Sequence, residues 1–184
     1  MSRPFSAVVL AGGYSSRMGR NKAELSIQGC SFLEHQVEKL RSVGIEDIVV
    51  SGTENAPEGC RCVPDIYPHR GPLSGVHAGL LTAQHESALV LAVDVPLVPA
   101  ETLEALLDAH SGGVTMLLHD GKEEPLIAVY DRALAELCGA ILQSERTSVR
   151  RLLEQTQLHR LPYTGDASLL INVNTEEEYQ ALQS

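Results

Sequence analysis

A stretch of glycine, serine and basic residues near the start of the chain has the composition of a phosphate-binding loop. It covers residues 10–22 and reads Leu-Ala-Gly-Gly-Tyr-Ser-Ser-Arg-Met-Gly-Arg-Asn-Lys. Because glycine has no Cβ, the backbone N–H groups of Gly12 and Gly13 can come close to phosphate oxygens. The guanidinium of Arg17 and the ammonium of Lys22 are cations well suited to a triphosphate. The stretch contains neither Gly-Lys-Ser/Thr nor Gly-x-Gly-x-x-Gly, so it is neither a Walker A loop nor a dinucleotide-binding fingerprint.

A carboxylate further along the chain is a candidate metal ligand. Asp94 follows residues 88–93, which are expected to form a buried strand, and Pro96 then turns the chain away. Ligands of open α/β sheets bind at the carboxyl ends of strands, and Mg²⁺ prefers carboxylate oxygens together with phosphate oxygens. The alternative is that Asp94 caps the next helix, but Glu101 and Thr102 lie closer to its start. We therefore predict that Asp94 holds Mg²⁺.

Two amides near the end of the chain could recognise a polar ring. Asn172 and Asn174 alternate along a stretch expected to be extended, so both should project to one side, with Val173 facing the core. Thr175 and Glu178 form a capping box that starts the last helix. An amide offers two donors and an acceptor, which suits a neutral ring edge better than a phosphate. One of the two asparagines could instead only satisfy backbone groups of the turn.

The elements that must position these groups alternate between strands and helices. Short apolar runs predict strands, and the 3.6-residue spacing of leucines and valines predicts helices. In the first half, strands are expected at residues 5–11, 47–51 and 88–93, with helices starting at Ser31, spanning 73–84, and containing Leu103, Leu106 and Leu107. This βαβαβα series is typical of a parallel sheet covered by helices.

The second half has a more mixed pattern. Strands are expected at residues 114–118 and 126–130, joined by a polar turn at 120–124, followed by helices at 132–142 and 148–155 and the last helix after Thr175. We predict a single domain over residues 1–184, with a nucleotide-binding half at about 1–110 and an acceptor-binding half at about 111–184. The fold class is α/β, with a mostly parallel central sheet in a Rossmann-like, three-layer arrangement.

Charge and cysteine content exclude several classes of partner. The net charge is −10, which disfavours nucleic acid and anionic membranes, yet the first 23 residues hold four of the 14 basic residues and no acidic one. No apolar run approaches the ~20 residues of a membrane span. The cysteines lack Cys-x-x-Cys spacing, and Cys60 and Cys62 fit one face of a short strand. A soluble, cytoplasmic protein with reduced thiols is expected.

Five motifs, in chain order, resemble those of the molybdenum-cofactor guanylyltransferases and of the wider nucleotidyltransferases that share their fold. They are residues 10–22, Arg70-Gly71-Pro72-Leu73-Ser74-Gly75, Val93-Asp94-Val95-Pro96, Glu124-Pro125-Leu126 with Tyr130, and Asn172-Val173-Asn174-Thr175. Each is weak evidence alone. Together they span nearly the whole chain at plausible spacings.

The resemblance implies transfer of GMP from GTP to the terminal phosphate of molybdopterin, with Mg²⁺ as cofactor and pyrophosphate as leaving group. GTP and the molybdenum cofactor would be the partners, with room for transient contact with proteins that deliver the cofactor. The implied site comprises Leu10, Ala11, Gly12, Gly13, Lys22, Asp65 and Asp94 for the nucleotide, Arg17, Lys22 and Asp94 for catalysis, Asp94 for the metal, and Asn172 and Asn174 for the acceptor.

The chain departs from the family pattern at two places. Asn21 stands before the loop lysine, where the family usually has aspartate, so a carboxylate has no role there. Ser51-Gly52-Thr53 follows the second strand, where the family often has asparagine, and no site residue is carried over to it. His69 and His77 flank the second glycine segment and are interpreted as solvated or core histidines.

Four other functions remain open from the sequence. Sugar-phosphate nucleotidyltransferases share the loop but are usually longer than this chain of 184 residues. A relative that transfers CMP to the same cofactor tends to carry alanine at the second loop glycine and to lack Gly-Pro-Leu, whereas this chain has Gly13 and Gly71-Pro72-Leu73. A non-catalytic GTP-binding regulatory module would bind GTP without releasing pyrophosphate. A flavoprotein of similar architecture would be coloured.

Overall fold

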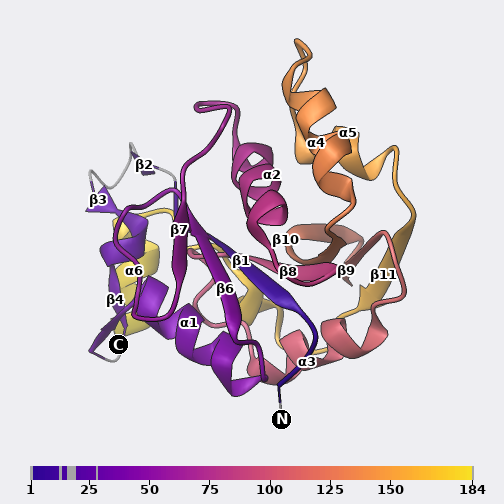
Figure 1. Ribbon diagram of the computed structural model, residues 1–184. Helices are drawn as coiled ribbons and strands as arrows, with labels where there is room; N and C mark the ends of the chain where they lie inside the picture. The colour runs from indigo at the N-terminus through magenta and orange to yellow at the C-terminus, as the bar shows by residue number, and fades with distance from the viewer. Residues whose placement is uncertain (1, 13, 16–19, 28, 184) are drawn as a thin grey trace.

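The computed structural model describes residues 2–12, 14–15, 20–27 and 29–183, and its centre is one seven-stranded sheet (Figure 1). In sheet order the strands are β11 (Leu158–Pro162), β9 (Val114–His119), β10 (Lys122–Asp131), β8 (Ser87–Ala92), β1 (Ser6–Leu10), β6 (Asp47–Ser51) and β7 (Arg61–Val63). β1 pairs in parallel with β6 and β8, β6 with β7, and β9 with β11. β10 runs antiparallel to both of its neighbours. The predicted mostly parallel sheet is confirmed.

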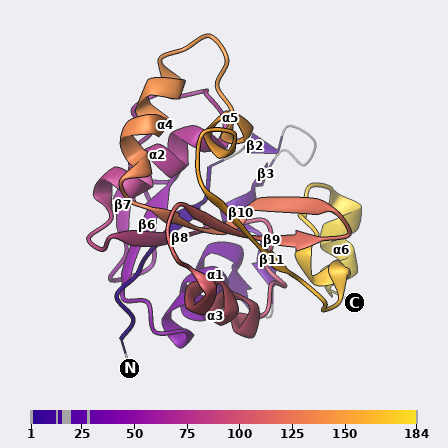
Figure 2. The same ribbon diagram turned by 90° about the vertical axis from the view of Figure 1, so that its right-hand side faces the viewer.

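Helices cover both faces of the sheet and make three layers (Figure 2). On one face lie α2 (Pro72–Thr82), α4 (Leu134–Leu142) and α5 (Val149–Leu153), and on the other lie α1 (Phe32–Ser42), α3 (Ala100–Ala109) and α6 (Glu176–Gln183). Each face has its own core of buried apolar side chains. β1 and β8 separate the two cores, and this double burial explains why both strands are almost wholly apolar in sequence.

Capping residues in the sequence correctly locate the helix ends. Ser31 accepts a hydrogen bond from Glu34 N at 3.2 Å, while the Glu34 carboxylate accepts one from Ser31 N at 2.8 Å, so the predicted capping box is present. After α1, Gly44 has a φ of 87°, a conformation that favours glycine. The second predicted box is also present, because Glu178 Oε2 accepts from Thr175 N at 2.9 Å and Thr175 Oγ1 accepts from Glu178 N at 3.2 Å.

The hairpin between β9 and β10 is tighter than the sequence suggested. Only Asp120 and Gly121 form the turn, with φ values of 48° and 76°, whereas residues 122–124 belong to β10. The predicted five-residue turn is therefore wrong, because the charged side chains of residues 122–124 were taken as a turn signal, although Glu124 is buried in the strand. The pairing with β9 shifts register between Glu124 and Ala128.

Two edge strands have weak sequence signals. β11 was not predicted, since its charged and proline residues hide the pattern of a strand that pairs on one side only. A short strand is present as predicted, but β7 contains only Cys62, whereas Cys60 lies just before its start. The remaining short elements are β2 (Tyr14–Ser15), β3 (Arg20–Asn21), η1 (Lys22–Glu24), β4 (Ser26–Ile27), β5 (Cys30–Ser31) and η2 (Ala167–Leu170). Among the described residues, no helix is long and apolar enough to cross a membrane.

Close packing of α2 on β1 leads to a stability prediction. A Cβ on Gly79 would overlap Val8 Cγ1 and Cγ2, and Val8 is fully buried and stiff at its branched Cβ. We expect Gly79→Ala to lower the free energy of unfolding by about 1–3 kcal/mol through overpacking, which outweighs the better helix propensity of alanine. The control is Leu81→Ala on the same helix, where the leucine is 54% exposed. Urea unfolding checks both, and an equal effect of the two changes would contradict this packing.

Candidate active site

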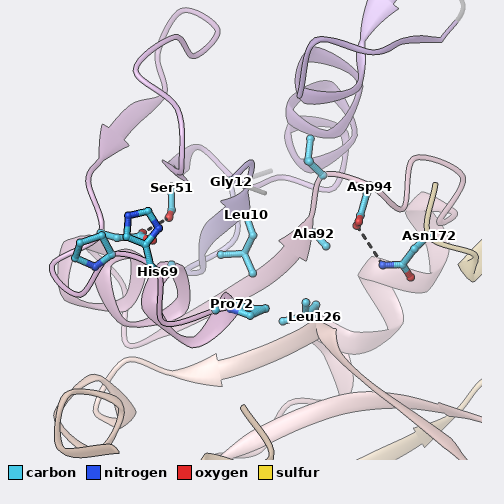
Figure 3. Close-up of a pocket in the computed structure, with 14 residues that line it drawn as sticks. Leu10, Gly12, Ser51, His69, Pro72, Ala92, Asp94, Leu126 and Asn172 are labelled. Atoms are coloured by element: carbon cyan, nitrogen blue, oxygen red, sulfur yellow. Dashed lines mark hydrogen bonds between the residues drawn. The ribbon is translucent and has the colours of Figure 1, made fainter. Parts of the chain in front are cut away.

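A cavity of about 540 Å³ opens where three parallel strands end, within the range typical of small-molecule sites (Figure 3). The register places Leu10 at the end of β1 opposite Ser51 of β6 and Ala92 of β8. All three residues line the cavity, together with Asp94 and Asn172. Chain segments from both halves of the sequence therefore meet at one edge of the sheet, as the sequence predicted for Asp94.

Gly12, which lines the cavity, is in close contact with Gly52. A Cβ on Gly12 would lie 3.1 Å from Gly52 Cα, and a Cβ on Gly52 would overlap the backbone of Gly12. Gly52 also has a φ of 88°, which disfavours any other residue. The backbone here is held by Ala11 N, which donates to Ser51 O at 2.8 Å. Gly12 is exposed and lines the cavity. The close approach of Gly52 disfavours a side chain at this position, whether or not a ligand binds there.

Asp94 faces the cavity from the chain that follows β8. Its Oδ1 accepts a hydrogen bond from Asn172 Nδ2 at 3.2 Å, and its carbonyl accepts one from Val173 N at 2.8 Å. The next helix, α3, has Pro99 as its N-cap, so the alternative role of Asp94 as a helix cap is excluded. The structure thus joins the candidate metal carboxylate directly to the candidate acceptor amide.

The two asparagines occupy different positions around this contact. Asn172 lines the cavity, and Val173 is only 3% exposed, in agreement with the predicted core position. Asn174 lies at the start of α6, where its backbone N–H donates to Glu178 Oε2 at 2.6 Å. That both amides bind an acceptor stays a prediction, with Asn172 the better placed of the two.

Asp65 is tied to the end of β6 by a residue that the sequence prediction passed over. Ser51 Oγ donates to Asp65 Oδ1 at 2.9 Å, and both side chains line the cavity. No site residue was expected at Ser51 because it replaces the asparagine of the family pattern. The buried apolar run of residues 47–50 could have indicated Ser51, because parallel strands end at the same edge of a sheet and this strand therefore ends beside residues 5–11.

The loop between Asp65 and α2 forms one wall of the cavity. Gly71 has a φ of 75° at the N-cap of α2, and Pro72 occupies the first turn, so the helix begins at the cavity. Gly75 brings this helix close to the strand ends, because a Cβ there would lie 2.8 Å from both Leu10 Cδ2 and Ser51 Oγ. The second glycine segment therefore packs against the first one.

The two histidines that flank this segment differ. His69 is exposed, in agreement with its interpretation as a solvated histidine, and it also lines the cavity with a φ of 63°. A left-handed histidine has no sequence signal. His77 is 6% exposed inside α2, and burial lowers its pKa, as expected for a core histidine.

Some predicted site residues lie beyond the described part of the structure. Gly13 and Arg17 are outside the described residues. Lys22 begins η1, but its side chain is not described. Their roles therefore remain sequence predictions. Leu10 and Ala11 are described, with Leu10 on the cavity wall and Ala11 buried beside it.

The carboxylates of the site fit a metal ion that arrives with its ligand. Among the described residues, no group of three or more histidine, cysteine, aspartate or glutamate side chains could hold a metal ion. Among the described residues that line the cavity, the carboxylates are Asp94, after β8, and Asp65, which is held by Ser51 at the end of β6. Mg²⁺ commonly binds through one or two carboxylates together with substrate phosphates and water, so one carboxylate at a phosphate site suits it.

Comparison with known proteins identifies relatives along nearly the whole chain. Residues 7–161 match the family model described as the MobA-like NTP transferase domain. A protein of Carboxydothermus hydrogenoformans named probable molybdenum cofactor guanylyltransferase is 34% identical and aligns with 95% of this chain and 92% of its own length. A protein of the same name from Bacillus cereus strain Q1 is 32% identical over 97% of this chain and 96% of its own.

A solved structure shares the fold. The molybdopterin-guanine dinucleotide biosynthesis protein A of Archaeoglobus fulgidus superposes with a TM-score of 0.81, covering 97% of this chain and 96% of that one. The sequences are 22% identical, so this likeness concerns the fold.

Proposed function

Since this chain belongs to the MobA-like NTP transferase family, we propose that it transfers GMP from GTP to the terminal phosphate of molybdopterin. The product is the guanine dinucleotide form of the molybdenum cofactor, and pyrophosphate is released. The observation that carries the proposal is the meeting of Gly12, Asp94 and Asn172 at one cavity. The names of the curated relatives, which align with more than nine-tenths of the chain, support the same substrates.

The reaction is a substitution at the α-phosphorus of GTP. An oxygen of the acceptor phosphate forms the new P–O bond, and the bond from the α-phosphorus to the oxygen that bridges to the β-phosphorus breaks. The attacking phosphate is already an anion near neutral pH, so no general base is required. The protein acts by holding the two phosphates in line and by offsetting negative charge.

The nucleotide half, about residues 1–110, would hold the triphosphate. The backbone of residues 10–13 would approach the nucleotide, because the glycines leave their N–H groups accessible. Arg17 and Lys22 would neutralise phosphate oxygens. Asp65, anchored by Ser51, would contact the nucleotide from the second loop.

Asp94 would hold Mg²⁺ at the phosphates. When bound, the ion supplies positive charge that stabilises the negative charge developing on the phosphate oxygens. Asn172 contributes by donating to one oxygen of this carboxylate, and both side chains line the cavity. The carboxylate is therefore oriented before a ligand binds.

The acceptor half, about residues 111–184, would bind the pterin. Leu126 and Asn172 line the cavity from this half, and they offer an apolar surface and an amide for a flat polar ring. Asn174 is the second proposed acceptor residue. Transfer would take place in the cytoplasm, where the free cysteines stay reduced, after delivery of the cofactor by other proteins.

Guanine is the base that the second glycine segment favours. Gly71 and Pro72 line the cavity, and they belong to the Gly-Pro-Leu motif that, by the family resemblance, separates the guanylyl from the cytidylyl branch. This position supports GTP over CTP as the nucleotide that the protein uses.

The proposal is tested by supplying each nucleoside triphosphate with molybdopterin cofactor and Mg²⁺. GTP should yield pyrophosphate and the dinucleotide product, and CTP should react at least about tenfold more slowly, because groups that pair with guanine would be left unpaired. Chromatography of the product and a pyrophosphate assay provide the measurement. Equal turnover of CTP would indicate a cytidylyltransferase, and tight GTP binding without pyrophosphate would indicate a regulatory module.

The roles of the cation and the carboxylate are tested by substitution. We expect Lys22→Ala and Asp94→Asn each to lower kcat/KM by about 100-fold, which corresponds to about 2.7 kcal/mol of transition-state stabilisation. The matched control is Asp120→Asn in the β9–β10 turn, where asparagine also tolerates a positive φ. Steady-state kinetics and melting curves check the variants. Turnover close to that of the wild type in either would refute the assigned roles.

A further inference from the structure

A fully buried glutamine holds the chain on both sides of Asp94. Gln36 belongs to α1 and is 0% exposed. Its Nε2 donates to Ala92 O at 3.1 Å and to Val95 O at 3.0 Å. One amide therefore fixes two carbonyl groups that flank the candidate metal ligand, from the side of the sheet that carries α1.

A lysine one turn further along the helix completes the arrangement. Lys39 Nζ donates to Gln36 Oε1 at 3.1 Å and to Pro96 O at 2.7 Å. Because an ammonium only donates, it requires the oxygen of the amide on its own side and so directs Nε2 toward Ala92 and Val95. Burial lowers the pKa of Lys39 to about 8, a value at which the amine is still mostly protonated at pH 7.

The opposite side of the same segment is also fixed. Val173 N donates to Asp94 O at 2.8 Å, and Val93 N donates to Leu10 O at 3.1 Å. Four carbonyl groups of this segment therefore accept hydrogen bonds from other parts of the chain, namely those of Ala92, Asp94, Val95 and Pro96. The segment has little freedom to turn the Asp94 side chain away from the cavity.

Packing alone does not account for a polar pair at this position. The other buried residues of α1 include Phe32, Leu33, Val37 and Leu40, which are apolar. Burying an amide and an ammonium costs free energy that apolar residues of similar size would not cost. What the pair adds is a defined backbone geometry at the end of β8, just where a metal ligand must be oriented.

We propose that Gln36 and Lys39 are positioning residues, which hold residues 92–96 so that the Asp94 carboxylate meets the metal ion carried by the nucleotide phosphates. The inference rests on the proposed function, because it assumes that Asp94 binds this ion.

The test measures how much Mg²⁺ strengthens GTP binding, as the ratio of the Kd in EDTA to the Kd in Mg²⁺, by calorimetry. Gln36→Met keeps the length of the side chain and removes its hydrogen bonds, and Lys39→Met removes the ammonium. Each should reduce the ratio about tenfold, the lower end of effects seen when partners of metal ligands are removed. The Kd for GTP in EDTA should stay within about twofold of the wild-type value, because binding of GTP without a metal ion does not depend on the orientation of Asp94.

A matched control separates positioning from stability. Val37→Ala removes buried apolar volume next to Gln36, from a side chain with no hydrogen-bonding group. It should lower the free energy of unfolding and leave the ratio unchanged. Lys39→Met, at a partly buried position, keeps the test decisive if Gln36→Met does not fold.

A double variant gives the sharpest result. With Asp94→Asn already present, adding Gln36→Met should change the ratio no further, because both changes act through one carboxylate. Equal losses in Gln36→Met and Val37→Ala, or additive losses in the double variant, would overturn the positioning role while leaving the proposed function intact. A wild-type protein that binds GTP equally with and without Mg²⁺ would instead remove the metal-dependent mechanism and this inference with it.

Discussion

The structure depends on the shared register of three parallel strands. β6, β1 and β8 end together, so that Ser51, Leu10 and Ala92 lie side by side. Buried side chains on both faces fix this register, because a slip of one residue would exchange the side chains of the two cores. The glycines, the serine and the aspartate that follow these strands are brought to one place by that constraint, although they are about 40 residues apart in sequence.

The two ends of the sheet use polar groups differently. Where β1 and β6 begin, Asp47 accepts hydrogen bonds from Ser6 Oγ at 2.5 Å and from Arg61. On the same side of the sheet, where the antiparallel strand β10 ends, His110 Nε2 lies 3.0 Å from Asp131 Oδ1. These groups pair with one another and fasten the strands. At the carboxyl ends of β1, β6 and β8, polar groups such as Asp94 and Asn172 face a cavity. The backbone on both sides of Asp94 is held by hydrogen bonds from Gln36 and Lys39 of α1. One end is closed by internal pairing, and the other is left able to bind a ligand.

The sequence predicts those parts of the fold that arise from local rules. The capping box at Ser31 and the buried run at residues 47–51 define their elements, since capping and burial leave a direct pattern of residue types. The site residues Gly12 and Asp94 were found because they follow such runs. Ser51 was missed because its role comes from a contact with Asp65, and His69 because a backbone angle has no signature. The buried amide of Gln36 was missed too, since one polar residue on an apolar helix face does not reveal its partner.

In the proposed mechanism, Asp94 binds the metal ion of a nucleotide that lies at these strand ends. A crystal structure with Mn²⁺ and a non-hydrolysable GTP analogue, recorded with anomalous scattering, measures the position of the ion directly. We expect an anomalous peak at metal-ligand distance, about 2.1 Å, from an Asp94 carboxylate oxygen and from phosphate oxygens. A nucleotide bound in this cavity with its metal ion away from Asp94, or a nucleotide bound elsewhere on the protein, would contradict it.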